Sequence, residues 1–399
     1  MDKKQQIMQI LTRDREQMVA FLRDIIALPS PSGGEKEAAA RTVQEMQRCG
    51  FDKAYTDEIG NAIGVVGSGK PTVLFDAHLD TVGIHDRNLW QHDPYKGAYE
   101  GGYVYGRGAA ENKGALAAII YGVKAMNEAG LLRGTVYVTG SVFEEDCDGL
   151  GLWYALAKTG LKPECVVVGK FTELKIMRGQ RGRMEIRITV PGKSCHASTP
   201  EEGVNPIYRA LPIIEGMEKL NKKLKKDTFL GKGTVAVTQI SVKSPGFNRL
   251  AHEAYLSIDR RLTVGETKEL ALRQLRDLPG AEEAKIEILT YEKPAYTGLA
   301  QKVEKYFPGW SVPEDSKIVK AAVAAYAEAI GGKPVIDKWT VSSNGVSSCG
   351  LLGIPTIGFG PGEKRYIHNY DDRIAVDDML KAAAFYALFP TTYKLLLLP

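Results

Sequence analysis

The order of strand and helix patterns is the feature of this sequence that most restricts its fold. Apolar strand patterns such as residues 72–80 alternate with helical patterns such as residues 114–130, and the alternation returns in the last part of the chain. Buried strands interleaved with helices are typical of an α/β architecture. Between these parts, residues 182–296 follow the order β-α-β-β-α-β, which is the ferredoxin-like pattern. The sequence therefore predicts an α/β domain, residues 1–181 and 297–399, with a second domain of residues 182–296 inserted into it.

Length and charge limit the class of protein. A chain of 399 residues exceeds one ordinary core, so two domains are expected. The net charge of +4 argues against nucleic acid as a partner. No apolar run approaches the ~20 residues that cross a bilayer, and the charged N-terminal segment is unlike an export signal. The five scattered cysteines favour reduced thiols and a cytoplasmic location. We interpret the lysine-rich residues 217–227 as a solvated helix face, with an anionic partner as the alternative.

Histidines and carboxylates follow several of the expected strands. His78 and Asp80 lie two apart on one strand, so both leave the same face, and a carboxylate often orients a metal-binding histidine. Glycines bracket Glu111 just before a helix, residues 144–146 are three adjacent carboxylates, and His368 lies in a loop after a strand. Adjacent carboxylates repel one another without a cation, and open α/β sheets place their sites at the carboxyl ends of strands. These side chains therefore predict a metal site.

Two other motifs carry less weight. Residues 64–70, GVVGSGK, have the spacing of a phosphate loop, but Pro71 stands where a magnesium-binding hydroxyl is required. A strand pattern follows this segment, so we interpret it as a turn. Cys195 and His196 are adjacent on an expected strand and point to opposite faces, which argues against a thiol nucleophile paired with this histidine.

With its motifs in this order, the sequence resembles the M20 family of metallopeptidases and amidohydrolases, which includes acetylornithine deacetylase and succinyl-diaminopimelate desuccinylase. Residues 178–188, RGQRGRMEIRI, and 192–198, GKSCHAS, make it most similar to the hydrolases linked to selenium metabolism. The resemblance covers nearly the whole chain. It implies a zinc-peptidase-like catalytic domain with a mixed central sheet, and a ferredoxin-like lid domain through which two chains form a homodimer.

The resemblance also implies roles for individual residues. The implied metal ligands are His78, Glu111, Glu145 and His368. The implied catalytic residues are Glu144 as general base, Asp80 as the partner that orients His78, and His196, which acts across the dimer. Asn248 and His196 are expected to hold the substrate carbonyl, and Arg261 a substrate carboxylate. The implied reaction is hydrolysis of an amide bond in a small N-acyl amino acid, dipeptide or related carboxylated amide, with one or two Zn²⁺ ions per chain, or Co²⁺ or Mn²⁺.

One site departs from the family pattern. Lys170, in GKFT, occupies the place of a metal-binding glutamate, and Glu111 replaces a bridging aspartate. A buried ammonium needs an acidic neighbour, and Glu111 is the expected one. Four explanations remain open: Lys170 is carboxylated on its amine and becomes a ligand; one metal is bound by Glu111, Glu145 and His368 while the ammonium replaces the other; Glu173 substitutes as a ligand; or hydrolase activity is lost. The last explanation describes a non-hydrolytic relative that binds a ligand or performs different chemistry.

Overall fold

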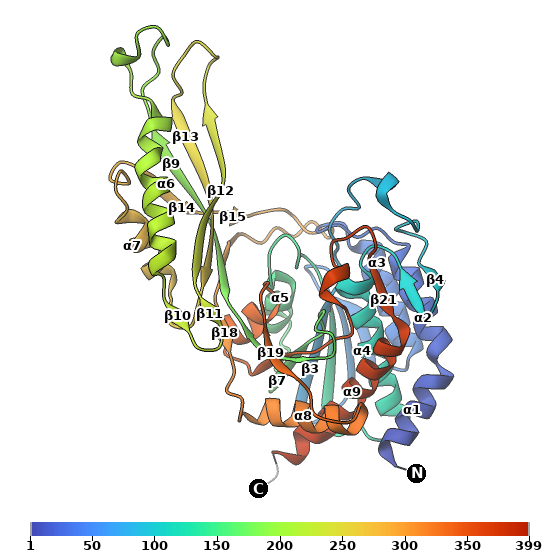
Figure 1. The fold of residues 1–399 in the computed structure, drawn as a ribbon. Helices are drawn as coiled ribbons and strands as arrows, with labels where there is room; N and C mark the ends of the chain where they lie inside the picture. The colour runs from blue at the N-terminus through green and yellow to red at the C-terminus, as the bar shows by residue number, and fades with distance from the viewer. Residues whose placement is uncertain (1, 398–399) are drawn as a thin grey trace.

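A mixed sheet of nine strands forms the centre of the larger part of the molecule (Figure 1). The computed structural model describes residues 2–397. The strand order is β1 (Lys53–Thr56), β2 (Ala62–Gly67), β6 (Thr135–Ser141), β3 (Thr72–His78), β7 (Cys165–Val168), β20 (Thr356–Gly358), β8 (Ile176–Gln180) and β18 (Trp310–Ser311), with β19 (Ile336–Trp339) also paired with β8. Strands β3, β6, β7 and β20 are parallel, whereas β1–β2, β2–β6 and β8–β18 are antiparallel pairs. The predicted α/β class with a mixed central sheet is confirmed.

Strand β3 shows why helices cover both faces of this sheet. Val73 and Phe75 face one hydrophobic core, and Leu74 between them faces another. Phe75 packs against Tyr386 and Phe389, with ring centres 5.3 and 6.2 Å apart. A strand that is apolar on both faces fits only between two layers. The first core includes α1 (Lys3–Arg13), α2 (Arg15–Ile26), α3 (Lys36–Arg48), α4 (Gly114–Glu128), α8 (Lys317–Ala329) and α9 (Val376–Leu395), and the second includes α5 (Leu150–Lys158).

A second sheet forms an arm that extends from the larger part (Figure 1). Its strand order is β12 (Thr234–Lys243), β13 (Glu253–Leu262), β9 (Gly182–Pro191) and β14 (Lys285–Ile288), all antiparallel, with β17 (Tyr306–Phe307) also paired with β9. Alternate residues of β9, such as Ile186 and Ile188, pack in a separate core with α6 (Pro206–Lys223) and α7 (Lys268–Arg276). The arm therefore has the order β-α-β-β-α-β, and β12 is an edge strand. The domain limits at residues 182 and 296 stay a prediction.

Short elements complete the chain. They are η1 (Arg87–Leu89), β4 (Ala98–Glu100), β5 (Tyr103–Tyr105), η2 (Ala109–Lys113), η3 (Pro200–Glu202), β10 (Lys226–Asp227), β11 (Gly231–Lys232), β15 (Thr290–Tyr291), β16 (Val303–Glu304), η4 (Val346–Leu351), η5 (Lys364–Tyr366) and β21 (Arg373–Ala375). Among residues 2–397, no helix is long and apolar enough to cross a membrane.

The β10–β11 hairpin fastens the base of the arm to the larger part. The Arg178 guanidinium of β8 lies 3.5 Å from the centre of the Phe229 ring, which sits in the turn of the hairpin. Lys338 of β19 donates to the Phe229 carbonyl, and Arg181 donates to the Lys232 carbonyl at 2.8 Å. Cation–π contacts of this kind contribute ~0.5–2 kcal/mol. These contacts hold the arm in the orientation seen here.

We expect Phe229→Ala to widen the range of arm orientations, because the ring is the surface on which Arg178 rests. Small-angle X-ray scattering should show a broader distribution of interatomic distances than in the wild type. Thr228→Ala, at an exposed position in the same turn, is the matched control and should leave the profile unchanged. Identical profiles for Phe229→Ala and the wild type would contradict the fastening role.

Candidate metal centre and active site

Five side chains from distant parts of the sequence converge at the carboxyl ends of the central strands. His78 ends β3, Glu144 and Glu145 follow β6, Glu111 lies in η2, and His368 lies in the loop before β21. His78 Nε2 is 3.5 Å from Glu144 Oε2 and 3.9 Å from Glu111 Oε1. His368 Nε2 is 3.1 Å from both Glu111 Oε2 and Glu145 Oε1. The structure thus brings together all four residues that the resemblance implied as ligands, and Glu144 with them.

Lys170 is buried inside this cluster. Its Nζ lies 2.8 Å from Glu111 Oε1 and 2.5 Å from Glu144 Oε1. Burial alone would lower the pKa of Lys170, but the facing Glu111 and Glu144 carboxylates outweigh it and raise the pKa well above its ordinary value. The pKa of Glu111 is lowered well below its usual range, against the effect of burial, by Lys170 and the two histidines. The expected contact with Glu111 is present, and the contact with Glu144 was not anticipated.

The donor set fits a divalent cation. His78 Nδ1 lies 2.9 Å from the Asp80 carbonyl, which can only accept, so in a neutral imidazole Nε2 is left as a free lone pair. That Nε2 is buried and has no hydrogen-bond partner. One ligand atom from each of His78, Glu111, Glu144 and Glu145 lies within 4.8 Å of the others. Imidazole nitrogens and carboxylate oxygens of this kind suit Zn²⁺.

The Asp80 carboxylate anchors the turn that carries the acids. It accepts the backbone N–H groups of Glu144 at 3.0 Å and Glu145 at 2.9 Å, and the Ser32 hydroxyl at 2.6 Å. Its Oδ1 is also 3.4 Å from His78 Nδ1. Phe143, just before the acids, has a φ of +67°, a conformation that costs a non-glycine residue roughly 1–3 kcal/mol. Asp80 therefore positions both His78 and the two acids. The sequence analysis predicted the first of these roles and missed the second.

The Asp372 carboxylate anchors the loop that carries Glu111. It accepts the backbone N–H groups of Gly108 at 2.8 Å and Ala110 at 2.9 Å, and pairs with buried Arg107 at 3.1 Å. Gly108 has a φ of +86°, and a Cβ there would approach Thr81 to 2.7 Å, so the loop requires glycine. The sequence showed two adjacent aspartates near His368 but no sign that the second one binds this loop.

A cavity of about 310 Å³ opens beside the cluster. Arg261 lines it and forms two hydrogen bonds of 2.7 and 3.0 Å with Asp259. Asp148 and Arg183 also line the cavity and pair at 3.3 Å, and the sequence analysis predicted no site role for either residue. Burial, and then the nearby Glu144, raise the pKa of Asp148 to about 6.

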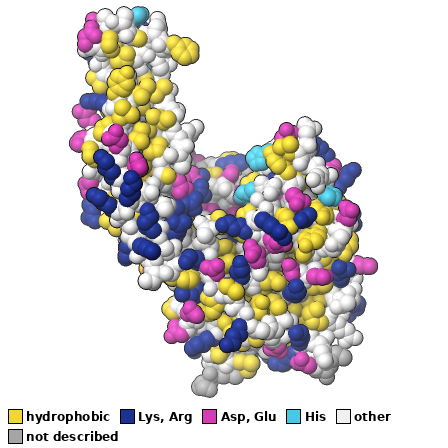
Figure 2. All heavy atoms as spheres, in the orientation of Figure 1, with side chains coloured by type: hydrophobic (Ala, Val, Ile, Leu, Met, Phe, Trp, Pro, Cys, Tyr) yellow, Lys and Arg dark blue, Asp and Glu magenta, His cyan; other side chains and the backbone are white. Residues whose placement is uncertain are grey.

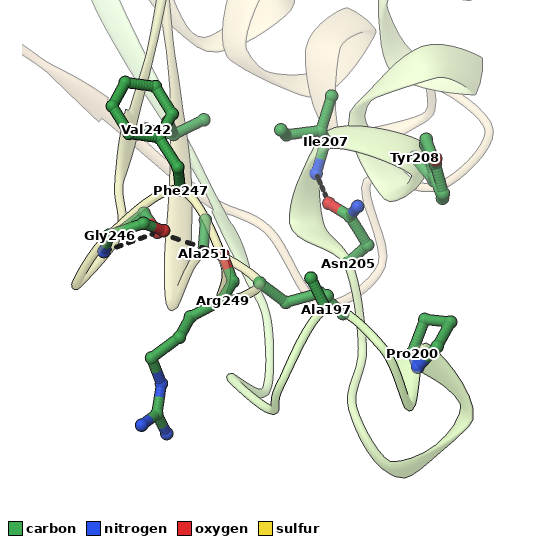
Figure 3. A pocket seen from close by; sticks show the side chains of 12 residues that line it. Ala197, Pro200, Asn205, Ile207, Tyr208, Val242, Gly246, Phe247, Arg249 and Ala251 are labelled. Atoms are coloured by element: carbon green, nitrogen blue, oxygen red, sulfur yellow. Dashed lines mark hydrogen bonds between the residues drawn. The ribbon is translucent and has the colours of Figure 1, made fainter.

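His196 and Asn248 lie elsewhere, at the far end of the arm. Neither is among the residues of 2–397 that line the cavity at the cluster. They are neighbours, because the Ala197 N–H donates to the Asn248 carbonyl at 2.8 Å. Ala197 and Arg249 line a separate hollow of about 800 Å³ at the tip of the arm (Figure 3). One chain does not bring these two predicted substrate-binding residues to the acids.

Glu173, considered as a substitute ligand, also lies outside the cluster. Its carboxylate pairs with Lys175 at 2.9 Å and is partly exposed. Glu173 is not among the residues of 2–397 that line the cavity or form the metal-binding cluster. The structure therefore gives no support to Glu173 as a ligand.

Comparison with known proteins agrees with this site. The family described as Peptidase family M20/M25/M40 matches residues 74–392. The Escherichia coli (strain K12) protein YgeY is 44% identical over 379 residues, covering 94% of each chain. Acetylornithine deacetylase from Buchnera aphidicola subsp. Schizaphis graminum is 26% identical over 325 residues, covering 78% of each. The Bacillus subtilis YXEP protein, described as a dinuclear metal-binding peptidase, has a TM-score of 0.69 at 15% identity, covering 95% of this chain and 98% of that one.

The chain belongs to the M20/M25/M40 peptidase family, as its motifs predicted. It is therefore a hydrolase, and the family together with the cluster of metal-binding side chains identifies its reaction as metal-dependent hydrolysis of an amide bond. The alternative of a non-hydrolytic relative is not favoured.

Replacing Asp80 should test the anchoring role. In Asp80→Asn an NH₂ group faces one of the two backbone N–H groups, so a buried donor loses its acceptor. We expect the free energy of unfolding to fall by about 1–3 kcal/mol, measured by urea denaturation in the presence of a chelator. Ser32→Ala removes one donor and leaves both anchored amides, so it should cost less. An Asp80→Asn protein as stable as the wild type would refute the anchor.

Proposed function

We propose that this protein hydrolyses the amide bond of a small N-acyl amino acid, dipeptide or related carboxylated amide, with Glu144 as general base. The observation that carries this proposal is the position of Glu144. Its carboxylate lies within the cluster of metal-binding side chains and on the wall of the same cavity that Arg261 lines. A binding protein has no need of a proton acceptor there.

Glu144 would take a proton from the attacking water and return it to the nitrogen of the leaving amine. Glu111, Glu145 and His368, with His78 nearby, are the side chains that would hold the metal, which we propose to be Zn²⁺, with Co²⁺ or Mn²⁺ as alternatives. When bound, the metal lowers the pKa of water and polarises the amide carbonyl. Arg261 would bind the substrate carboxylate, and the acetylornithine deacetylase relative supports an N-acyl amino acid as the substrate class.

We further propose that two chains form a dimer in which His196 and Asn248 of one chain serve the cavity of the other. Strand β13 is continuous over 10 residues, with Asn248 before its start and Arg261 near its end. At ~3.3 Å per residue the strand is about 30 Å long. No rotation of the arm can therefore bring both residues of one chain to a single small substrate.

The surface of the arm supports this arrangement. β12 is an edge strand, and its outward residues Ile240 and Val242 are 50% and 44% exposed. Apolar side chains gather along the upper part of the arm in Figure 2, and Tyr208 and Phe247 line the hollow at the tip. An exposed edge strand with apolar neighbours is a pairing surface for another chain. A cytoplasmic location remains our proposal, supported by five unpaired cysteines.

We expect Glu144→Gln to retain fold and metal but to lose turnover by about 10²–10⁴-fold, because the amide side chain cannot accept the proton of water. Release of amine from a panel of N-acyl amino acids and dipeptides measures turnover, and circular dichroism checks the fold. Asp146→Asn is the matched control, since Asp146 belongs to the same acid triplet but contacts Tyr291 and Lys293. Near-normal turnover in Glu144→Gln would rule out the proposed mechanism.

Mixing two inactive variants should test the shared site. Neither Glu144→Gln nor His196→Ala is expected to turn over substrate alone. In a mixed dimer, the His196→Ala chain supplies an intact Glu144 and the other chain supplies an intact His196, so one of the two sites is complete. We therefore expect activity to return when the variants are unfolded together and refolded. If both residues act within one chain, the mixture stays inactive, and the proposal fails.

A further inference from the structure

We propose that the ammonium group of Lys170 permanently occupies one of two cation positions in the carboxylate cluster, so that each chain binds a single divalent cation between Glu111, Glu145 and His368. This inference rests on the proposed function only in taking the cluster as the catalytic centre. It assigns Lys170 as a built-in counter-ion and positioning residue for Glu144.

The oxygens of Glu111 divide the cluster into two halves. Oε1 faces Lys170 Nζ at 2.8 Å, whereas Oε2 faces His368 Nε2 at 3.1 Å. On the His368 side, Glu145 Oε1 is also 3.1 Å from Nε2, and no ammonium contacts these atoms in the described part of the chain. The Glu111 carboxylate therefore connects two halves of the cluster. One half holds the Lys170 ammonium, and the other offers one oxygen each from Glu111 and Glu145 together with the His368 imidazole.

The half that contains His78 lacks a free oxygen from Glu111. The nearest carboxylate atoms to His78 Nε2 are Glu144 Oε2 at 3.5 Å and Glu111 Oε1 at 3.9 Å. The second of these is the oxygen that already accepts from Lys170, which also bonds the other oxygen of Glu144 at 2.5 Å. The unpartnered His78 Nε2 therefore does not by itself make this half a cation site, because a cation there would stand beside the ammonium and compete with it for the same carboxylates.

Charge favours one divalent cation over two. Lys170 contacts two of the three glutamates of the cluster, Glu111 and Glu144, with its ammonium group. A second divalent ion near His78 would lie beside that ammonium within a buried site. Like charges a few ångströms apart repel more strongly in a poorly solvated environment than in water. Lys170 therefore excludes the second ion by charge as well as by space.

Lys170 cannot easily swing out to make room. Its side chain is 4% exposed, and its backbone carbonyl lies against Gly360, where a Cβ would be only 2.1 Å away. The flanking residues are tied down, because Asn112 donates to the Gly169 carbonyl at 2.6 Å and the Thr172 hydroxyl to the Gly360 carbonyl at 2.9 Å. The ammonium is thus a fixed part of the site.

Metal stoichiometry tests this inference without reference to activity. The purified protein is stripped with a chelator and titrated with Co²⁺, and bound metal is measured by visible absorption and by elemental analysis. We expect the wild type to saturate at one ion per chain and Lys170→Glu to bind two. Lys175→Glu makes the same change five residues along the segment, where the lysine pairs with Glu173, and should still bind one.

The position of the single ion is tested by the two histidines. His368→Gln should lower Co²⁺ affinity by at least tenfold, whereas His78→Gln should retain one tightly bound ion. The opposite pattern would overturn the assignment of the ion to the His368 side. Circular dichroism of each variant checks the fold. The number of ions bound per wild-type chain tests the inference even if a variant fails to fold.

Two ions in the wild type would overturn the inference, and a carbon dioxide adduct on Lys170 in the intact mass would explain them by carboxylation. If such a protein hydrolyses amides, the proposed function survives while the inference fails. One ion without hydrolysis of any amide would leave the inference standing and remove the proposed function. A wild type that binds no ion would overturn both.

Discussion

The excess of negative charge at the carboxyl ends of β3, β6 and β7 is the constraint on which the rest of this site depends. Glu111 and Glu144 are buried, and buried carboxylates are costly unless a positive charge or hydrogen-bond donors compensate them. Lys170 lies two residues after the end of β7, and β3 lies between β6 and β7 in the sheet. The strand order therefore places the ammonium against acids that follow β6, and the topology of the sheet decides the electrostatics of the site.

Buried acids here serve two different purposes. The carboxylate oxygens of Asp80 and Asp372 accept hydrogen bonds from backbone N–H groups. These bonds fix the turns that carry Glu144 and Glu111. Glu144 and Glu111 themselves face cationic side chains and the cavity. Activity in such a site needs both the anchoring aspartates and the glutamates that face the cavity. A carboxylate that must accept a proton cannot use its own oxygens to fix its position, so another residue has to fix it.

Much of this arrangement could be predicted from the sequence. The positions of His78, Glu145 and His368 at strand ends follow from local patterns, and the ferredoxin-like order of the arm follows from alternation. The contact between Lys170 and Glu144 joins segments 26 residues apart, and the anchoring by Asp372 joins segments more than 260 apart. Such contacts depend on tertiary packing, which no local pattern encodes. The separation of Asn248 from Arg261 follows from β13, because Asn248 precedes this uninterrupted strand and Arg261 lies near its end.

The arm has its own core and long continuous strands. Its shape cannot change much, so the position of its tip is set where it joins the larger part. There the β10–β11 hairpin rests on Arg178 and Lys338, and β19, which contains Lys338, leads directly into Thr340 and Ser342 of the cavity wall. The wall of the cavity and the support of the arm therefore share a single short strand, β19.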